Sequence, residues 1–272
     1  MSDTALTRGM RWFKALAGDT STDAPVWSAE ASLGGETASF FAVVPDPDNR
    51  FPRARDNVVG LEQGWKLAQA VRAAVARDAA SERKRPIVAI VDVKSQAYGY
   101  REETLGIHLA CASAVDAYAS ARDAGHPVIA LIVGPAMSGA FLAHGYQANR
   151  ILALDAPGTM VHAMGKEAAA RVTRRTVEDL DKLGETITPM SYTMASFAKL
   201  GLLDQLIGDV DADAPTDAQI DSVRSVLAEA VQGARMDTTR GLSRRLESDT
   251  AKKTRAASIE VRRRLAEQWD AA

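Results

Sequence analysis

The segment of this chain best suited to chemistry follows a fully apolar run at residues 128–133. Such a run is typical of a strand buried on both faces of a parallel sheet. Small residues at 134–139 then predict a tight turn, and residues 140–145 predict a short helix. The N–H groups of Gly139 and Ala140 would lack intrahelical partners there, so they could donate to an anion or a developing oxyanion. A turn kept small only for packing explains the same residues, so this segment alone leaves both interpretations open.

Few other residues could take part in catalysis or in ligand binding. Cys111 is the one cysteine, which excludes an internal disulfide, and its alanine-rich surroundings predict a small core residue. His108 is predicted to lie in packing or at the surface, and His126 in a turn. His144 follows the tight turn, where a structural role is favoured over a place in the site. No ligand spacing predicts a metal site, and no glycine-rich phosphate-binding motif occurs.

Alternating strands and helices must position the turn. Apolar runs at 39–44 and 87–91 predict further buried strands, and a helix with regular apolar spacing is predicted over 61–75. A second helix precedes the turn. Its predicted buried face comprises Leu105, Leu109, Ala112, Val115 and Ala119. The pattern indicates an α/β fold with a mainly parallel sheet and flanking helices.

Three regions are predicted along the chain. Residues 1–35 are expected to form an N-terminal extension, with a short apolar helix face and then a loop over 19–35. Residues 36–235 are expected to form the main domain, and residues 236–272 a basic C-terminal helix. That helix suits either a solvated face or a docking surface for an acidic carrier protein. Its basic residues are Arg240, Arg244, Arg245, Lys252, Lys253, Arg255, Arg262, Arg263 and Arg264.

Composition excludes several classes of protein. The chain has 272 residues, of which 46% are apolar and 25% charged, as expected for a globular protein with a core. A net charge of −2 predicts no binding of nucleic acid by the chain as a whole. No apolar run approaches the roughly 20 residues of a membrane helix, and the N-terminus lacks the apolar stretch of a secretory signal. These features predict a cytoplasmic location.

Three segments of the sequence resemble those of a known protein family. The string GPAMSGAFLAHGYQANRILALDAPGTMVHAMG resembles the central element of the crotonase-like carboxyltransferases. The string VDVKSQAYGYREETLGIHLACASAV resembles the preceding strand, loop and helix of that family, and FAKLGLLDQLI resembles its Gly-Leu-x-Asp segment. The likeness spans about residues 36–207. Within this family, the chain is most similar to the gamma subunits of biotin-independent malonate decarboxylases.

The resemblance implies a crotonase-like (ClpP/crotonase) fold and a reaction that this chain carries out together with a second subunit. A beta subunit of similar fold and this chain would together decarboxylate a malonyl thioester on an acyl-carrier subunit, giving an acetyl thioester and CO₂. An acyl transferase subunit would complete the hetero-oligomer. The phosphopantetheine-type arm of the carrier would be substrate, with no cofactor bound directly and biotin not expected, although biotin-dependent decarboxylases use a similar chain.

The resemblance also implies site residues. Backbone N–H groups of an oxyanion hole are assigned to Ser138, Gly139 and Ala140. Losing CO₂ leaves an enolate, which such donors stabilise, so no metal or nucleophile is required. The facing loop and substrate side are assigned to Gln96, Tyr98, Gly99, Gly134 and His162.

Two alternatives remain open. Clp-like serine peptidases share this fold, and Ser138 with His162 would supply a nucleophile and a base. Against this, residues 186–203 contain no Asp or Glu, and Ala-Met stands at 163–164 where those peptidases carry Gln-Pro. The other alternative is a non-catalytic partner that completes the site of another subunit.

Overall fold

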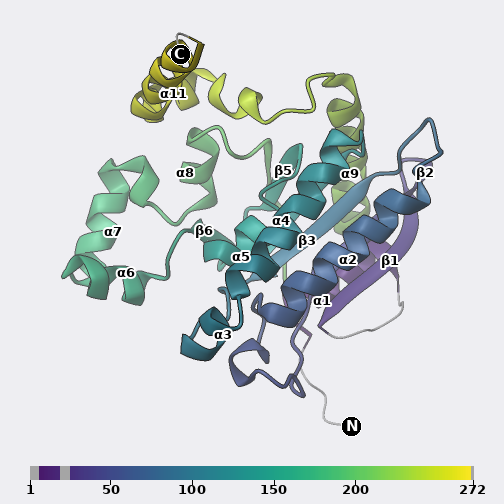
Figure 1. The fold of residues 1–272 in the computed structure, drawn as a ribbon, viewed down its shortest axis with the longest axis horizontal. Coiled ribbons are helices and arrows are strands. Elements are labelled where there is room, and N and C mark those ends of the chain that lie inside the picture. The colour runs from purple at the N-terminus through teal and green to yellow at the C-terminus, as the bar shows by residue number, and fades with distance from the viewer. Residues whose placement is uncertain (1–5, 19–24, 271–272) are drawn as a thin grey trace.

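A single twisted sheet organises the chain. In this computed structural model, which describes residues 6–18 and 25–270, seven strands follow the order β1-β2-β3-β4-β5-β7, with β6 paired to β4 (Figure 1). The β1–β2 pair is antiparallel and the other pairs are parallel, which confirms the predicted α/β fold. The strands are β1 (Val26–Leu33), β2 (Glu36–Val43), β3 (Ile87–Val93), β4 (Val128–Met137), β5 (Arg150–Leu154), β6 (Met160–His162) and β7 (Gln205–Ile207).

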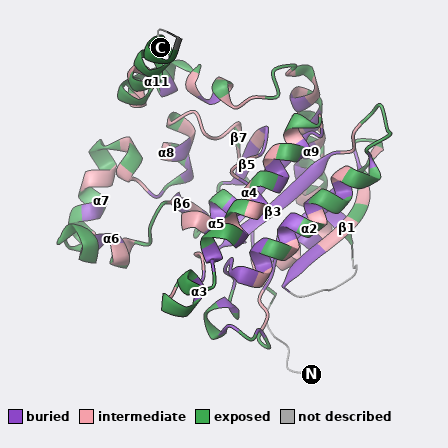
Figure 2. Cartoon of the chain, viewed as in Figure 1, coloured by how far each residue is buried: buried purple, intermediate pink, exposed green. Residues whose placement is uncertain are grey.

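Helices cover both faces of the sheet. On one face lie α2 (Leu61–Arg77) and α4 (Ile107–Asp123), and on the other lie α1 (Arg8–Ala17) and α9 (Asp217–Met236). Figure 2 shows the central strands buried between these layers. Alternate residues of β3 serve the two sides: Ala89 and Val91 face α2 and α4, whereas Val88 and Ile90 face α1 and α9. This explains why residues 87–91 of β3 are apolar without interruption.

The crossing of α2 and α4 overturns the predicted burial of α4. A β-carbon on Gly64 of α2 would lie 2.7 Å from the carbonyl oxygen of Ala110, so the two backbones approach closely. Small residues of α4 therefore face inward. The predicted buried face was wrong, because Leu105 and Leu109 are 55% and 58% exposed. The inward residues include Ala110, Ala114, Ala117 and Ala121.

The N-terminal region packs as part of the same core. The side chains of Trp12 and Phe13 in α1 are buried against the sheet, and β1 pairs with β2 along its whole length. The loop predicted over 19–35 was therefore wrong for β1, because pairing with β2 makes a strand of a segment without clear periodicity. Residues 19–24 of that predicted loop lie outside the described residues.

Shorter helices surround the carboxyl ends of the strands. Beyond β6, α6, α7 and α8 form an outlying group (Figure 1), where α6 and α7 share a small apolar cluster. No helix of the described chain is long and apolar enough to cross a membrane. These shorter elements are η1 (Pro52–Ala54), α3 (Tyr100–Thr104), α5 (Ser138–Ala143), α6 (Lys166–Thr173), α7 (Val177–Thr186), η2 (Thr188–Met190) and α8 (Met194–Lys199).

The C-terminal region is not the single helix that was predicted. It divides into η3 (Ser243–Leu246), α10 (Asp249–Thr254) and α11 (Ala256–Asp270). The side chain of Ser248 accepts a hydrogen bond from the N–H of Ala251 at 3.1 Å, which caps a new helix start. Arg245 is buried and donates to the carbonyls of Tyr146 and Ala148 at 2.9 and 2.6 Å. Some basic residues thus hold this region to the domain, and a docking role for the others stays a prediction.

Candidate active site

The end of β4 changes partners just before the predicted turn. Its first half pairs with β5, from Ile129 to Ile132, and its last three residues pair with β6. The register between β3 and β4 also shifts between Val91 and Val93. The end of β4 therefore exchanges β5 for β6 on one side while Ala136 still pairs with Val93 of β3, and the chain turns directly into α5 after Met137.

The turn contains a residue in the left-handed region of backbone conformation. Ser138 has φ of +61°, which is uncommon for a residue with a side chain. Gly139 and Ala140 follow in the first turn of α5, where N–H groups have no intrahelical partner. The positive φ thus falls on Ser138, and Gly139 is small for a different reason.

That reason is the side chain of Gln96. A β-carbon on Gly139 would lie only 1.8 Å from Gln96 Oε1, so the amide occupies the space beside the glycine. The loop carrying Gln96 is fixed by a parallel bridge to Val59, whose N–H donates to the Ser95 carbonyl at 3.0 Å. In return, the N–H of Ala97 donates to the Val59 carbonyl at 2.8 Å. The structure therefore brings together the two segments that the sequence analysis placed opposite each other.

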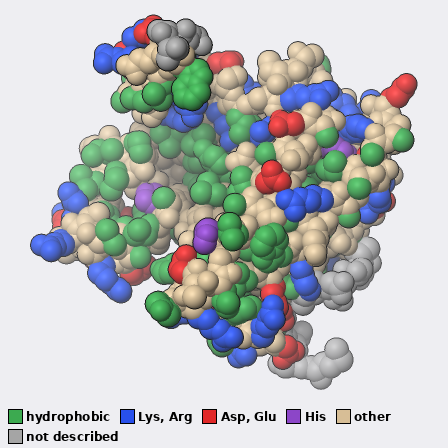
Figure 3. Space-filling view, in the orientation of Figure 1, with side chains coloured by type: hydrophobic (Ala, Val, Ile, Leu, Met, Phe, Trp, Pro, Cys, Tyr) green, Lys and Arg blue, Asp and Glu red, His purple; other side chains and the backbone are tan. Residues whose placement is uncertain are grey.

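A pocket of about 290 Å³ opens where these segments meet. Its walls are mostly apolar and come from α4 and α5, and Leu142 of α5 is half exposed at its side. Figure 3 shows hydrophobic side chains gathered on the face of the molecule that carries α5, α7 and α8. The lining residues are Gln96, Glu103, Ile107, His108, Cys111, Ala112, Val115, Gly139 and Leu142.

Of the predicted site residues, Gln96 and Gly139 line this pocket, whereas Ser138, Ala140, Tyr98, Gly99, Gly134 and His162 do not. Tyr98 is 54% exposed on the loop after Gln96. A β-carbon on Gly99 would lie 2.5 Å from Glu102 Oε2, so this glycine serves local packing. Gly134 makes room for a buried carboxylate, because a β-carbon there would lie 2.4 Å from Asp92 Oδ1. Their roles toward a substrate stay predictions.

The Asp92 carboxylate has a structural partner in the N-terminal helix. It accepts a hydrogen bond from the N–H of Gly9 at 2.8 Å, at the start of α1. Burial raises the pKa of Asp92 above its ordinary value. The contact fastens α1 to the end of β3, which explains why the neighbouring strand carries a glycine at position 134.

His162 lies next to the turn but is held away from Ser138. It pairs in register with Met137, its ring stacks on Tyr192 with centroids 3.9 Å apart, and Nδ1 accepts from the N–H of Met164 at 3.2 Å. Burial lowers the pKa of His162. Among the described residues, no hydrogen bond joins Ser138 to His162 and no carboxylate bonds the ring. The pair does not have the geometry of a serine-peptidase site.

His144 has the structural role that was favoured for it. Nδ1 accepts from the Tyr118 hydroxyl at 3.0 Å, and Nε2 donates to the Ile90 carbonyl at 2.9 Å, which fixes one neutral tautomer. Burial lowers the pKa of His144 to about 4, so the ring is uncharged at neutral pH.

The sequence analysis missed the helix wall of the pocket. Cys111 was predicted to be a core residue, but it is half buried and lines the pocket beside His108, which is exposed. Burial raises the pKa of the Cys111 thiol to about 11, so the thiol is protonated at neutral pH. The available signal was the spacing of Ile107, Cys111 and Val115, which places them on one side of α4.

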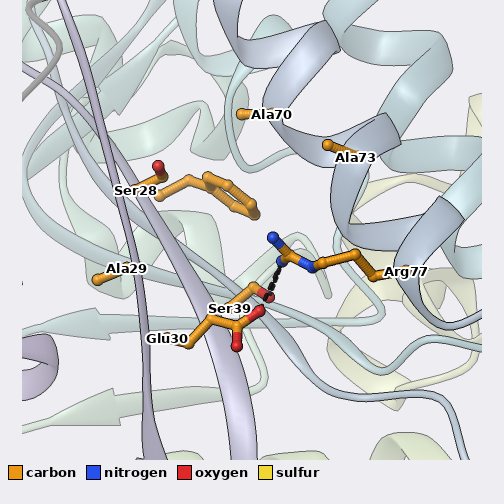
Figure 4. Close-up of a pocket in the computed structure, with 8 residues that line it drawn as sticks. Ser28, Ala29, Glu30, Ser39, Ala70, Ala73 and Arg77 are labelled. Carbon is orange, nitrogen blue, oxygen red and sulfur yellow. Dashed lines mark hydrogen bonds and ion pairs between the residues drawn. The ribbon is translucent and has the colours of Figure 1, made fainter. Parts of the chain in front are cut away.

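A second hollow of about 390 Å³ lies between α2 and the first two strands (Figure 4). Arg77 reaches into it, pairs with Glu30 at 2.7 Å and donates to Ser39 Oγ at 3.3 Å. Because its charged groups neutralise each other, this hollow offers little to a charged substrate. The described residues also contain no cluster of His, Cys, Asp or Glu suited to a metal ion.

Comparison with known proteins identifies the family of this chain. The profile of the malonate decarboxylase gamma subunit matches residues 54–269. A chain of a Pseudomonas malonate decarboxylase hetero-tetramer solved with coenzyme A is 53% identical, with a TM-score of 0.91 over 97% of this chain and 100% of that chain. A chain of the Pseudomonas MdcD-MdcE hetero-dimer is 52% identical, with a TM-score of 0.88 and the same coverage.

More distant relatives bear on chemistry and fold. The malonyl-S-ACP:biotin-protein carboxyltransferase of Malonomonas rubra is 37% identical over 167 residues. That alignment covers 60% of this chain, and the chain spans 57% of the length of that relative. Transcarboxylase 12S, at 20% identity and a TM-score of 0.62, supports the crotonase-like fold alone. The matched family profile and the full-length structural agreement show that this chain belongs to the malonate decarboxylase gamma-subunit family.

Proposed function

We propose that this chain, with a beta subunit of similar fold, removes CO₂ from a malonyl thioester carried by an acyl-carrier protein. The product would be the acetyl thioester, and the reaction would take place in the cytoplasm. The observation that carries the proposal is the turn after β4, where the left-handed Ser138 leads into the unpaired N–H groups of α5 beside Gln96. Family membership supplies the reaction class.

The proposed chemistry requires stabilisation of an enolate. The bond between the α-carbon and the carboxylate breaks, CO₂ leaves, and the electron pair passes to the thioester oxygen. The N–H groups of Gly139 and Ala140 would donate to that oxygen, and one such donor is typically worth about 3–4 kcal/mol. A proton from solvent then adds to the α-carbon and gives the acetyl thioester.

The pocket walls suit the movement of charge in this step. The negative charge leaves the malonyl carboxylate, which departs as neutral CO₂, and passes to the thioester oxygen, so apolar surroundings at the carboxylate favour its departure. Ile107, Val115 and Leu142 provide such surroundings. The Gln96 amide, beside Gly139, would orient the thioester through a neutral hydrogen bond.

A beta subunit is proposed to cover the outer side of α4 and α5. Leu105, Leu109 and Leu142 expose large apolar side chains near the pocket, and such patches mark interaction surfaces. The Pseudomonas relative is described as a hetero-dimer, which supports a partner of this kind. The carrier and an acyl transferase subunit would complete the assembly, and the thioester arm of the carrier would be the substrate.

The M. rubra relative favours a second candidate function. Its name describes transfer of the carboxyl group to a biotin protein. In that case the same enolate would form, but the carboxyl group would be captured by biotin. Free release of CO₂ is proposed here because the full-length resemblance is to malonate decarboxylases.

Reconstitution tests the proposal. The chain is co-expressed with its beta subunit and supplied with malonyl carrier protein, and the acyl carrier species are followed by mass spectrometry. We expect acetyl carrier and CO₂ from the complex, an obligate interface of about 2,000 Å² or more, and at most about a thousandth of the rate from the chain alone. Efficient turnover by the lone chain would contradict the proposal, and dependence on a biotinylated protein would favour the second candidate.

A further inference from the structure

Helix α11 (Ala256–Asp270) carries a stripe of exposed apolar side chains. Val261, Leu265 and Trp269 recur at a spacing of four residues, so they lie on one side of the helix. These residues, called the α11 stripe below, are 56%, 58% and 84% exposed. Tryptophan is largely buried in most globular proteins, and a contiguous exposed apolar surface is typical of an interaction site.

The helix as a whole lacks a buried residue. Every residue from 256 to 269 is exposed or only partly buried. Helices of this length are marginal in water by themselves, and in proteins most of their stability comes from packing of an apolar face. Arg263 and Arg264 pair with Glu260 at 2.8 and 2.7 Å, but such pairs stabilise an exposed helix only slightly. The main stabilising contact of α11 is therefore expected to come from another protein.

The base of the helix is fixed to the domain. Ala251 of α10 is fully buried, and a β-carbon on Gly201 would lie 2.7 Å from the Ala251 side chain. Thr254 Oγ1 donates to the Lys199 carbonyl of α8 at 2.9 Å. Helix α11 begins two residues later, so the domain sets its direction while the α11 stripe stays open.

Helix α11 shares one face of the molecule with α5 and α8. In Figure 1, α11 stands apart from the sheet, beyond α8. Figure 3 shows hydrophobic side chains on α11 and, across a hollow, over α8 and α5. Leu142 of α5, which the proposed beta subunit covers, is half exposed. A partner that covers α5 and enters this hollow would therefore meet α11 as the next wall.

We infer that the α11 stripe is a second contact surface for the beta subunit, which α11 holds across the hollow from α5. This inference rests on the proposed function, because it names how the partner of that function is bound. The chemistry of the stripe favours the beta subunit over the carrier. Apolar and aromatic contacts are typical of obligate subunit interfaces, whereas a carrier must dissociate in every catalytic cycle.

The area that a stable pair requires supports the same partner. Obligate interfaces bury about 2,000 Å² or more, and the three exposed leucines beside the pocket supply only a small part of that area. A helix of 15 residues is about 22 Å long, so α11 adds a second row of apolar contacts. The beta subunit would then be held at two separate surfaces of this chain.

Affinity for the beta subunit tests the inference. Val261→Glu, Leu265→Glu in the full chain should weaken binding by about 30-fold or more, because charges replace two apolar contacts. Ala256→Glu, Ala266→Glu is the matched control, since it adds the same charge at exposed positions of α11 outside the stripe. The control should bind within about three-fold of the unaltered chain. Both variant chains should keep the melting temperature of the unaltered chain, because all four positions are exposed.

Hydrogen exchange supplies a second measurement. Amide exchange within residues 256–269 should slow at least about ten-fold when the beta subunit is added, because packing would stabilise the helix. Unchanged exchange, or equal affinities of the two double variants, would overturn the inference.

Two other occupants of the stripe have distinct outcomes. If the stripe variant bound the beta subunit normally but lost kcat/KM for the malonyl carrier protein, the stripe would belong to the carrier. If the unaltered chain alone were a dimer that the stripe variant dissociates, the stripe would belong to a second copy. Either result would overturn the inference. Affinity and exchange do not require turnover, so a bound complex that fails to decarboxylate would contradict the proposed function alone.

Discussion

The two ends of strand β4 differ in the chemical groups that surround them. At the carboxyl end, the groups available to a ligand are backbone N–H donors beside a glycine, and the surrounding walls are apolar. At the amino end, charged side chains surround a polar hollow, and their terminal atoms are tied to the chain itself. The first region leaves apolar surface exposed, whereas the second is closed by the protein's own segments.

This difference indicates which end of β4 needs a partner protein to cover it. A backbone site needs close approach and exclusion of water, because its donors are weak until desolvated. Around the pocket, Leu105 and Leu109 are exposed, on the face where we propose that a partner excludes water. At the amino end, the last turn of α9 supplies Arg235 and the segment after it supplies Arg240, so this chain itself closes the hollow.

The largest expected effect comes from filling the space beside the turn. Gly139→Val should lower turnover of the assembled complex by about 100-fold or more, because its β-carbon would lie 1.8 Å from Gln96 Oε1 and displace the amide. Gly208→Val is the control, since a β-carbon there meets nothing within 4 Å. Steady-state decarboxylation is measured beside size-exclusion chromatography. Normal turnover of Gly139→Val in an intact complex would place the oxyanion donors in the partner.

The exposed face beside the pocket provides the next test. The double variant Leu105→Lys, Leu109→Lys should weaken binding of the beta subunit by about 30-fold or more, because two apolar anchors become charged. A control with Ser120→Lys and Gln232→Lys adds the same charge at exposed positions outside this face. Affinity is measured by surface plasmon resonance. Equal affinities for both double variants would exclude this face as the interface.

A smaller effect concerns the buried histidine beneath the turn. The pKa of His144 is about 4 in the folded chain against 6.5 as its ordinary value, so the unfolded chain binds the proton more readily. The contribution of the neutral His144 ring to the free energy of unfolding is complete above about pH 6.5, and it is lost as the pH falls toward 4. Between about pH 7.5 and pH 5, this loss should be about 2 kcal/mol.

Urea unfolding at the two pH values measures that loss. His144→Gln should reduce the pH dependence by about the same amount, whereas His108→Gln, at an exposed position, should leave it unchanged. An unaltered pH dependence in His144→Gln would show that other groups govern acid destabilisation.

The strands that the sequence predicts well are those with a single physical explanation. The apolar runs at residues 87–91 and 128–133 of β3 and β4 occur because helices cover both faces of the sheet there. Strand β1 escaped prediction because its alanine and serine residues carry little periodicity, and its strand form depends on pairing with β2. The buried face of α4 was mispredicted for a different reason. Helical periodicity shows which residues are apolar, but not whether this chain or a partner covers them.

The candidate site was predictable only in its backbone elements. The small residues at 138–140 and the facing Gln96 were identifiable, because strand ends and short turns bring such segments together. Cys111 on the pocket wall was not, since its neighbours predict an ordinary core helix. Gly134 has a structural reason that local sequence does not reveal, because its small size makes room for the Asp92 carboxylate across the strands, and its role toward a substrate stays a prediction.

The most direct test of the central claim asks whether the turn acts through its backbone or through the hydroxyl of Ser138. Ser138→Gly removes the hydroxyl and also accommodates φ of +61° without strain, and Ser138→Ala removes the hydroxyl alone. Steady-state decarboxylation of malonyl carrier protein by the assembled complex is the measurement. We predict turnover within about five-fold of the unaltered complex for both variants. A fall of about 10⁴-fold or more in both, with an intact complex, would make Ser138 a nucleophile and contradict the account.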